Sequence, residues 1–203
     1  MSFQWIFDNA EQISINNGPI VAQTTSIDGT VRSTNLGGAV WTFTVTYPDG
    51  PRWTDTRQNI AKMEALDRYT SANVQINNSG YNTWLTKYQG NVANTSAVTA
   101  SWTTGNSITL TSGQATSGYN FRAGDLVQLG TGNSVYQVTA DVAYNSNTVN
   151  LHRPILESAG NATLKIGTAV TWTVRMISKP SWTIFSRDQV SWSGPFVFQE
   201  DLT

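Results

Sequence analysis

The chain has no cysteine among its 203 residues and only one histidine, His152. The absence of cysteine excludes disulfides, thiolate zinc sites and cysteine nucleophiles. A single histidine needs partner side chains before it can act as a general base or a metal ligand. His152 follows Leu151 at the end of an expected strand, beside Arg153. We therefore expect a structural or surface role for it.

Charged residues are also scarce, at 12% of the chain, which is about half the usual share. The 12 Lys and Arg residues nearly balance the 13 Asp and Glu residues, and they form no basic cluster. Phosphate neutralisation supplies much of the affinity for nucleic acid, so nucleic acid is not an expected partner. Weak repulsion between copies of such a chain favours a subunit of an assembly over a free monomer.

Long hydrophobic runs are absent. No stretch approaches the ~20 apolar residues that a membrane helix needs. The first residues, MSFQWIFDNAEQ, lack the basic segment and apolar core of a signal peptide. We expect synthesis and folding in a cytoplasm, without membrane insertion.

Patterns typical of active sites are missing as well. Asp125 and Asp141 flank expected strands, and two carboxylates can hydrolyse a glycoside if they flank one bond. An Asp at a strand entrance more often binds local backbone amides or an arginine such as Arg153. The glycines of Gly37-Gly38 and of Gly130–Asn133 predict turns, because no Lys and helix follow as in a phosphate-binding loop. The sequence predicts no enzyme, no cofactor and no metal site.

The chain is instead rich in Thr (28), Ser (19) and Asn (18), with 39% hydrophobic and 11% aromatic residues. These polar types favour strands, turns and caps over helix interiors. In Trp41–Tyr47 and in Val170–Met176, apolar residues alternate with Thr, the pattern of half-buried strands of one sheet. Further short strands are expected at residues 107–111, 126–129, 135–140 and 148–151, and at 190–192 and 196–198, the last two returning to the N-terminal sheet.

One helix is expected, from about Asp55 to Tyr69. Asp55 followed by Gln58 resembles a capping box, which satisfies backbone N–H groups at a helix start. Ile60, Met63 and Leu66 then form one apolar stripe, so the helix should lie across a sheet face.

The texture of the sequence changes near residue 92, where aromatic density falls and turn residues recur about every ten positions, as in small sandwiches and barrels. We predict a mainly β fold: a β-sandwich or barrel with one short α-helix, plus a second inserted small β domain. The core domain would comprise residues 1–88 and 166–203, and the inserted β-barrel-like domain residues 89–165.

Six of the eight tryptophans fall into two groups. Trp41, Trp172 and Trp192 lie within alternating apolar segments and are expected in the core. Trp84, Trp102 and Trp182 lie in polar, turn-rich segments. These three are candidates for exposed side chains at a protein interface or on a glycan.

Several segments together resemble proteins of the distal tail or baseplate of tailed bacteriophages. The first is RSTNLGGAVWTFTVTYP (Arg32 to Pro48), which leads into the expected helix. The others are FRAGDLVQLG (Phe121 to Gly130), YQVTADV (Tyr136 to Val142) and VNLHRPI (Val149 to Ile155). The closing VSWSGPFVFQE (Val190 to Glu200) is similar to the end of such sequences.

The resemblance implies a virion structural protein without catalytic residues, located in the tail. It would form a hexameric ring, or part of one, through contacts with its own copies and with other tail or baseplate proteins. The alternative is a carbohydrate-binding β-sandwich module that uses exposed Trp and Tyr side chains.

Overall fold

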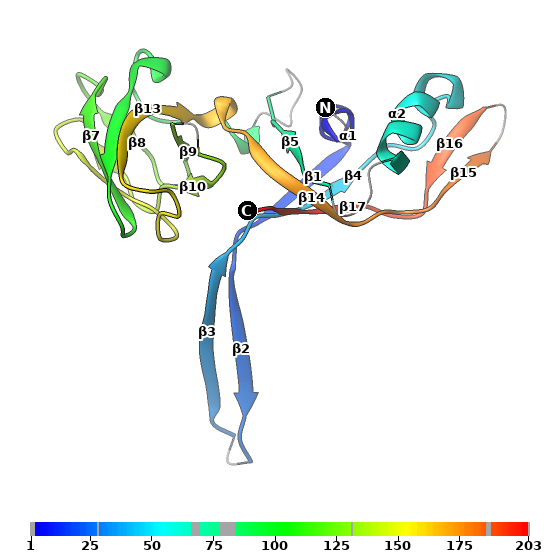
Figure 1. Cartoon of the computed structure of the whole chain (residues 1–203), viewed down its shortest axis with the longest axis horizontal. Coiled ribbons are helices and arrows are strands. Elements are labelled where there is room, and N and C mark those ends of the chain that lie inside the picture. Colours follow the sequence, from blue (N-terminus) through cyan, green and yellow to red (C-terminus); the bar gives the residue numbers. More distant parts are fainter. Residues whose placement is uncertain are drawn as a thin grey trace.

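The computed structural model describes residues 3–27, 29–65, 70–77, 84–130, 132–185 and 188–202. Strands hold 42% of the residues and helices 15%, which confirms the predicted mainly β fold with sandwich-like and half-barrel-like sheets. Figure 1 shows two sheet-containing lobes side by side and a long hairpin that projects away from both. None of the described helices is long and apolar enough to cross a membrane.

The first sheet has five antiparallel strands in the order β1-β4-β17-β14-β5. Both alternating segments lie in it, as β4 and β14, and β17 separates them. Their membership of one sheet was predicted correctly. The bounds are Gln12–Asn16 for β1, Thr42–Thr46 for β4, Ala72–Val74 for β5, Trp172–Ser178 for β14 and Phe196–Glu200 for β17.

Alternation gives this sheet one buried face, because successive side chains point to opposite sides. Phe43, Phe198 and Trp172 are fully buried on it. Helices α1 (Gln4–Asp8) and α2 (Trp53–Ala65) lie on that side (Figure 1). The Phe7 ring of α1 lies 5.8 Å from the Phe43 ring and 5.1 Å from the Phe198 ring. The core therefore fills the space between α1, α2 and the sheet.

Helix α2 confirms the expected stripe in part. Ile60 and Met63 are buried, whereas Leu66 lies outside the described residues. The capping-box interpretation of Asp55 is wrong, because the helix begins at Trp53 and the Asp55 amide already donates to the Arg52 carbonyl. Asp55 instead places a negative charge in the first turn, where its interaction with the positive end of the helix dipole stabilises the helix.

The second sheet has six strands in the order β10-β9-β13-β6-β7-β12, and β8 pairs with β11 beside it. All of these strands lie between Thr99 and Ile166. The bounds are Thr99–Trp102 for β6, Ser107–Ser112 for β7, Tyr119–Phe121 for β8, Leu126–Leu129 for β9, Val135–Gln137 for β10, Val142–Ala143 for β11, Thr148–Asn150 for β12 and Gly160–Ile166 for β13. Short 3-10 turns at Thr95–Ala97 and Gly167–Ala169 precede β6 and follow β13.

The two edge strands of the second sheet meet, which gives this part a barrel-like form. Val138 forms a bridge with Leu151, and the Thr139 amide donates to the Asn150 carbonyl at 3.0 Å. Its core is a separate cluster that includes Phe121 and Tyr136. We call residues 99–166 the second lobe. That it is an inserted domain with boundaries at 89 and 165 stays a prediction.

The last third of the chain supplies a separate hairpin, β15 (Trp182–Phe185) and β16 (Gln189–Trp192), whose strands pair with each other. The predicted return of residues 190–192 to the first sheet is therefore wrong, and only β17 returns. The hairpin lies beside α2 (Figure 1). It is attached there because the Val190 amide donates to the Pro51 carbonyl at 2.9 Å and the Trp192 amide to Asp49 Oδ1 at 3.0 Å.

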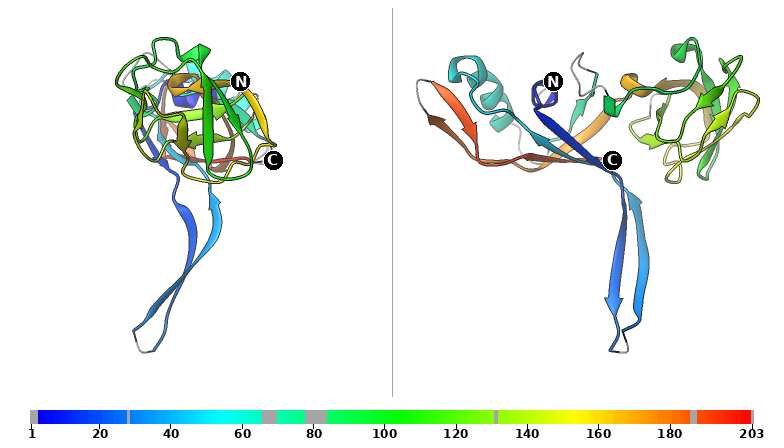
Figure 2. Two further views of the ribbon diagram at one scale, coloured as in Figure 1. Left: turned by 90° about the vertical axis from the view of Figure 1, so that its left-hand side faces the viewer. Right: turned by 180° about the vertical axis from the view of Figure 1, so that it is seen from behind.

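The sequence did not predict the most prominent feature, a long hairpin of β2 (Pro19–Thr25) and β3 (Val31–Ala39). The predicted turn at Gly37-Gly38 is wrong, because both glycines lie within β3. At about 3.3 Å per residue, strands of this length span roughly 23–30 Å. Figures 1 and 2 show the hairpin leaving the body near the junction of the two lobes. We call it the arm.

Candidate interaction surfaces

The arm is a two-stranded ribbon with solvent on its described side chains. Residues 22–27 and 29–32 are all exposed, including Ile27 at the tip and Val31 at 59%. Gly29 adopts a φ of +81°, which glycine tolerates, and closes the tight turn. Neither strand pairs with any other strand of the described chain. The arm therefore presents open backbone edges as well as apolar side chains.

The root of the arm is fixed to the second lobe at both strands. Asn17, just before β2, donates through Nδ2 to Gln137 Oε1 at 2.7 Å. The carbonyl of Ala39, at the end of β3, accepts from Arg153 Nη1 at 2.7 Å. Both partners belong to the second lobe, so the direction of the arm is tied to the position of that lobe.

Arg153 also forms a buried ion pair across the junction of the lobes. Its Nη1 lies 2.7 Å from Glu200 Oε2 and its Nη2 lies 2.8 Å from Glu200 Oε1, a two-pronged contact with side chains 3% and 0% exposed. Glu200 belongs to β17 of the first sheet. Trp41 adds a second link, since its Nε1 donates to the Val135 carbonyl at 2.7 Å. These contacts hold the first sheet, the second lobe and the arm root together.

His152 lies beside this ion pair. Its Nδ1 accepts a hydrogen bond from the backbone amide of Gln137 at 3.0 Å, and its ring lies 5.3 Å from the Trp41 ring. Burial, reinforced by the charge of Arg153, lowers the pKa of His152 to about 4. The imidazole is therefore neutral near pH 7 and serves as a hydrogen-bond acceptor within the junction. No group of three or more potential metal ligands occurs in the described residues.

The two aspartates singled out by the sequence are held by separate contacts. Asp125 is 3% exposed and accepts the backbone amides of Gln89 at 2.9 Å and Arg122 at 2.8 Å. Burial raises its pKa despite these bonds. Asp141 is exposed and binds the Ala123 amide at 2.9 Å and Arg122 Nη1 at 2.6 Å, which together lower its pKa. The arginine that the sequence suggested, Arg153, pairs elsewhere.

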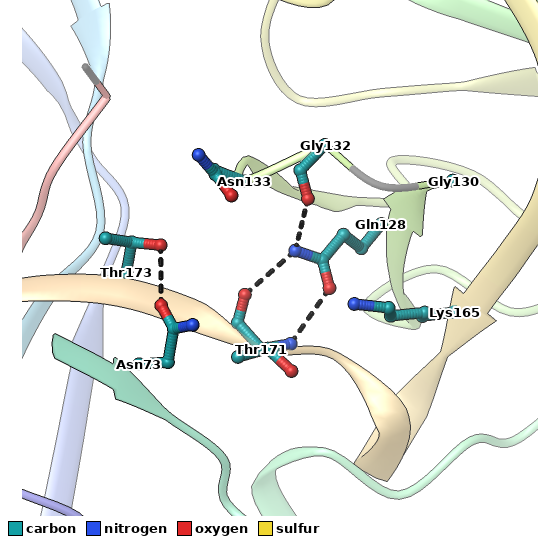
Figure 3. Close-up of a pocket in the computed structure, with 8 residues that line it drawn as sticks. All are labelled: Asn73, Gln128, Gly130, Gly132, Asn133, Lys165, Thr171 and Thr173. Atoms are coloured by element: carbon teal, nitrogen blue, oxygen red, sulfur yellow. Dashed lines mark hydrogen bonds between the residues drawn. The ribbon is translucent and has the colours of Figure 1, made fainter. Parts of the chain in front are cut away.

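A polar pocket of about 280 Å³ lies where β9 meets the segment leading into β14 (Figure 3). Gln128 is 2% exposed and spans the gap: Nε2 donates to the carbonyls of Gly132 at 2.8 Å and Thr171 at 2.9 Å, and Oε1 accepts the Thr171 amide at 3.0 Å. On the opposite wall, Asn73 Oδ1 accepts the Thr173 hydroxyl at 3.0 Å. The Gln128 amide therefore acts as a further tie between the lobes.

The hairpin β15–β16 and α2 form a second surface. The indoles of Trp53 and Trp182 stack with ring centroids 4.8 Å apart. Glu64 on α2 accepts Lys179 Nζ at 2.8 Å and Trp182 Nε1 at 3.3 Å, and these hydrogen bonds lower the pKa of Glu64. On β15, Ile184 is 51% exposed.

A groove of about 370 Å³ is lined by side chains of α2, and we call it the α2 groove. Trp53, Ile60 and Ala61 give it an apolar lining, and polar side chains flank it. The complete lining is Trp53, Arg57, Gln58, Ile60, Ala61 and Glu64.

The three tryptophans predicted to be exposed have different environments. Trp84 is 74% exposed, with Lys87 Nζ 5.7 Å from its ring centroid. Trp182 is half-buried on Trp53, next to the α2 groove. The expected exposure of Trp102 is wrong: it is 9% exposed, packs in the second core, and donates from Nε1 to the Ser158 carbonyl at 2.8 Å.

A small pocket of about 290 Å³ adjoins Trp102 and includes the carboxylate of Glu157. Glu157 accepts the Tyr136 hydroxyl. Burial of the Tyr136 hydroxyl raises its pKa, and the hydrogen bond to Glu157 raises it further. The tryptophans predicted for the core are buried as expected: Trp41, Trp172 and Trp192.

Sequence reasoning missed the arm and the Arg153–Glu200 pair. The arm had a readable signal, because Asp28-Gly29 is a favoured hairpin turn and it lies between two β-prone segments, VAQTT and VRST. The ion pair had none, since its partners are 47 residues apart.

The sequence matches no known protein family, and no curated protein is similar to it.

Proposed function

We propose that this chain is a structural subunit of a phage tail end or baseplate, which assembles into a ring through protein–protein contacts. The observation that carries the proposal is the arm. Its two strands project into solvent with their backbone edges open and with Ile27 and Val31 exposed.

A free ribbon of this kind is incomplete by itself. A two-stranded hairpin is at best marginally stable in water, and stability comes from a third strand or from packing against another element. Monomeric proteins usually shorten, charge or cover such edges to prevent unwanted pairing. From Pro19 to Ala39 the sequence has only two charged residues, Asp28 and Arg32. An arm built this way fits a subunit whose partner completes it.

The body fits the same role. Arg153 ties the first sheet, the second lobe and the arm root into one unit, so a contact made by the arm constrains the orientation of both lobes. The low charge of the chain removes much of the repulsion between copies. A rigid, weakly charged body with a projecting arm suits repetitive assembly.

The assignment to a phage tail rests on the sequence segments that resemble distal tail and baseplate proteins. One of them, Arg32 to Pro48, begins in β3 of the arm and continues through β4 of the first sheet. Under this proposal the protein resides in the virion tail and contacts other tail or baseplate proteins as well as its own copies, in a hexameric ring or part of one. Catalysis has no part in it.

Electron microscopy of the purified chain at high concentration tests the proposal. We expect closed rings with a central opening and one fixed subunit number. Particles no larger than a single subunit, at every concentration and with no ring on addition of tail proteins, would rule out the ring-forming subunit.

A carbohydrate-binding module is the second candidate, and exposed Trp84 favours it because an indole face can stack on a sugar ring. On a glycan array, Trp84→Ala should then abolish binding to the glycans that the wild-type chain binds. A wild-type chain that binds no glycan on the array removes this candidate.

A further inference from the structure

The tip of the arm carries an apolar side chain with no support from its own chain. Ile27 is 110% exposed, which means that it is as open as in an isolated peptide. Val31, the partner of Thr25 in the ribbon, adds a second apolar side chain at 59% exposure near the same end. A partner that covers these aliphatic side chains removes their apolar surface from water, which favours binding.

The same molecule carries a matching recess, the α2 groove. Its lining combines the apolar residues Trp53, Ile60 and Ala61 with polar side chains such as Arg57 and Glu64, as an interface combines apolar and polar residues. Its volume of about 370 Å³ is large enough for an isoleucine side chain with its neighbours. The groove is rigidly framed, since Trp53 stacks on Trp182 and Glu64 is held by Lys179.

An arm cannot reach the groove of its own chain. The arm descends from the junction of the lobes, on the side of the first sheet opposite α2, and its tip points away from α2 in all views (Figures 1 and 2). The contacts of Asn17 and Ala39 with the second lobe fix this direction. If a tip occupies the groove, that tip must therefore belong to a different molecule.

We infer that the tip of the arm binds a second copy of this chain and places Ile27 in the α2 groove of that copy. The inference rests on the proposed assembly function and names its contact. The two surfaces differ, so the contact is head-to-tail, and repetition of it yields a ring when the rotation closes. Each subunit then gives one arm and receives one.

Crosslinking tests this contact directly, because the chain has no cysteine of its own. Ile27→Cys and Ala61→Cys are prepared as single variants and as a double variant, and both positions are exposed on the surface. A bismaleimide crosslinker should produce heterodimers from mixed single variants and a ladder of covalent multimers from the double variant. Leu156→Cys, at a 53% exposed position on the second lobe, replaces Ala61→Cys as the control and should give no heterodimer.

A matched pair of substitutions measures the contribution of the tip. Ile27→Asp should raise the concentration at half-assembly roughly 10- to 100-fold, the factor expected from burial of one isoleucine side chain. Leu156→Asp makes the same chemical change elsewhere and should leave that concentration unchanged. Ala61→Arg, which fills the groove while keeping a good helix former, should weaken assembly as Ile27→Asp does.

The outcomes separate this inference from the proposed function. Multimers that form normally but give no crosslink between positions 27 and 61, and that tolerate Ile27→Asp, would overturn the inference and leave assembly intact. A chain that stays monomeric at every concentration, both alone and on addition of tail proteins, would overturn both.

Discussion

Replacement of Arg153 by Met tests whether the junction of the lobes depends on the buried ion pair. Arg153→Met keeps most of the side-chain volume and removes the guanidinium. Glu200, 0% exposed at its side chain, would then retain only the backbone amides of Trp41 and Val135, both at 3.3 Å. The Ala39 carbonyl at the arm root would also lose its donor.

The expected cost follows from the uncompensated charge. Loss of one partner of a buried pair costs about 3–5 kcal/mol, because the remaining charge stays desolvated. Removal of both charges costs much less, so Arg153→Met combined with Glu200→Met should lose no more than about 2 kcal/mol. The two substitutions should therefore be strongly non-additive.

Urea denaturation at pH 7, followed by tryptophan fluorescence, measures the free energy of unfolding for the wild type, both single variants and the double variant. The central comparison is the coupling energy of the cycle. An Arg153→Met variant within about 1 kcal/mol of the wild type, or additive single losses, would refute a central role for the pair.

Three further perturbations follow from the buried contacts, each measured as the free energy of unfolding in urea. Trp41→Ala and Trp172→Ala should each lose about 3–5 kcal/mol, and wild-type-like unfolding of both would contradict their place in the core. The folded-state pKa of His152 is about 4, below its ordinary 6.5, so the unfolded chain takes up this proton first. The free energy of unfolding should therefore fall by up to about 3 kcal/mol as the pH drops from 6.5 to 4. His152→Asn keeps an acceptor for the Gln137 backbone amide and should make the free energy of unfolding less dependent on pH in this range. The same pH dependence in the variant as in the wild type would exclude His152 as its cause. Asp125→Ala should cost about 1–2 kcal/mol because the part-buried backbone amides of Gln89 and Arg122 lose their acceptor. Asp141→Ala should change stability little because its ion pair is exposed, and equal effects would contradict this assignment.

Local patterns predicted three of the five strands of the first sheet, β4, β14 and β17. Trp41–Tyr47 and Val170–Met176 alternate apolar residues with Thr, and burial of one sheet face requires that alternation. Recurring turn residues, which separate short apolar segments, identified β7, β9, β10 and β12 of the second lobe, whereas β6, β8, β11 and β13 were not predicted. Ile60 and Met63 correctly predicted the buried stripe of α2, whereas the start of the helix at Trp53 was not predicted.

The interaction surfaces depend on information that local patterns lack. The described side chains of the arm at residues 22–27 and 29–32 are all exposed, so burial of one face imposes no hydrophobic alternation on them. Only the Asp28-Gly29 dipeptide marks the arm in the sequence. Trp102 looked exposed because its neighbours are polar, yet β6 and β13 bring it into the second core. Arg153 and Glu200 meet only because β17 returns to the junction of the lobes.

Sedimentation velocity combined with light scattering, on the purified wild-type chain across a micromolar concentration series, is the most direct test of assembly. We expect one discrete species whose mass is a fixed multiple of the 22.2 kDa chain and which dissociates on dilution. A single 22.2 kDa species over the whole series would contradict assembly by this chain alone.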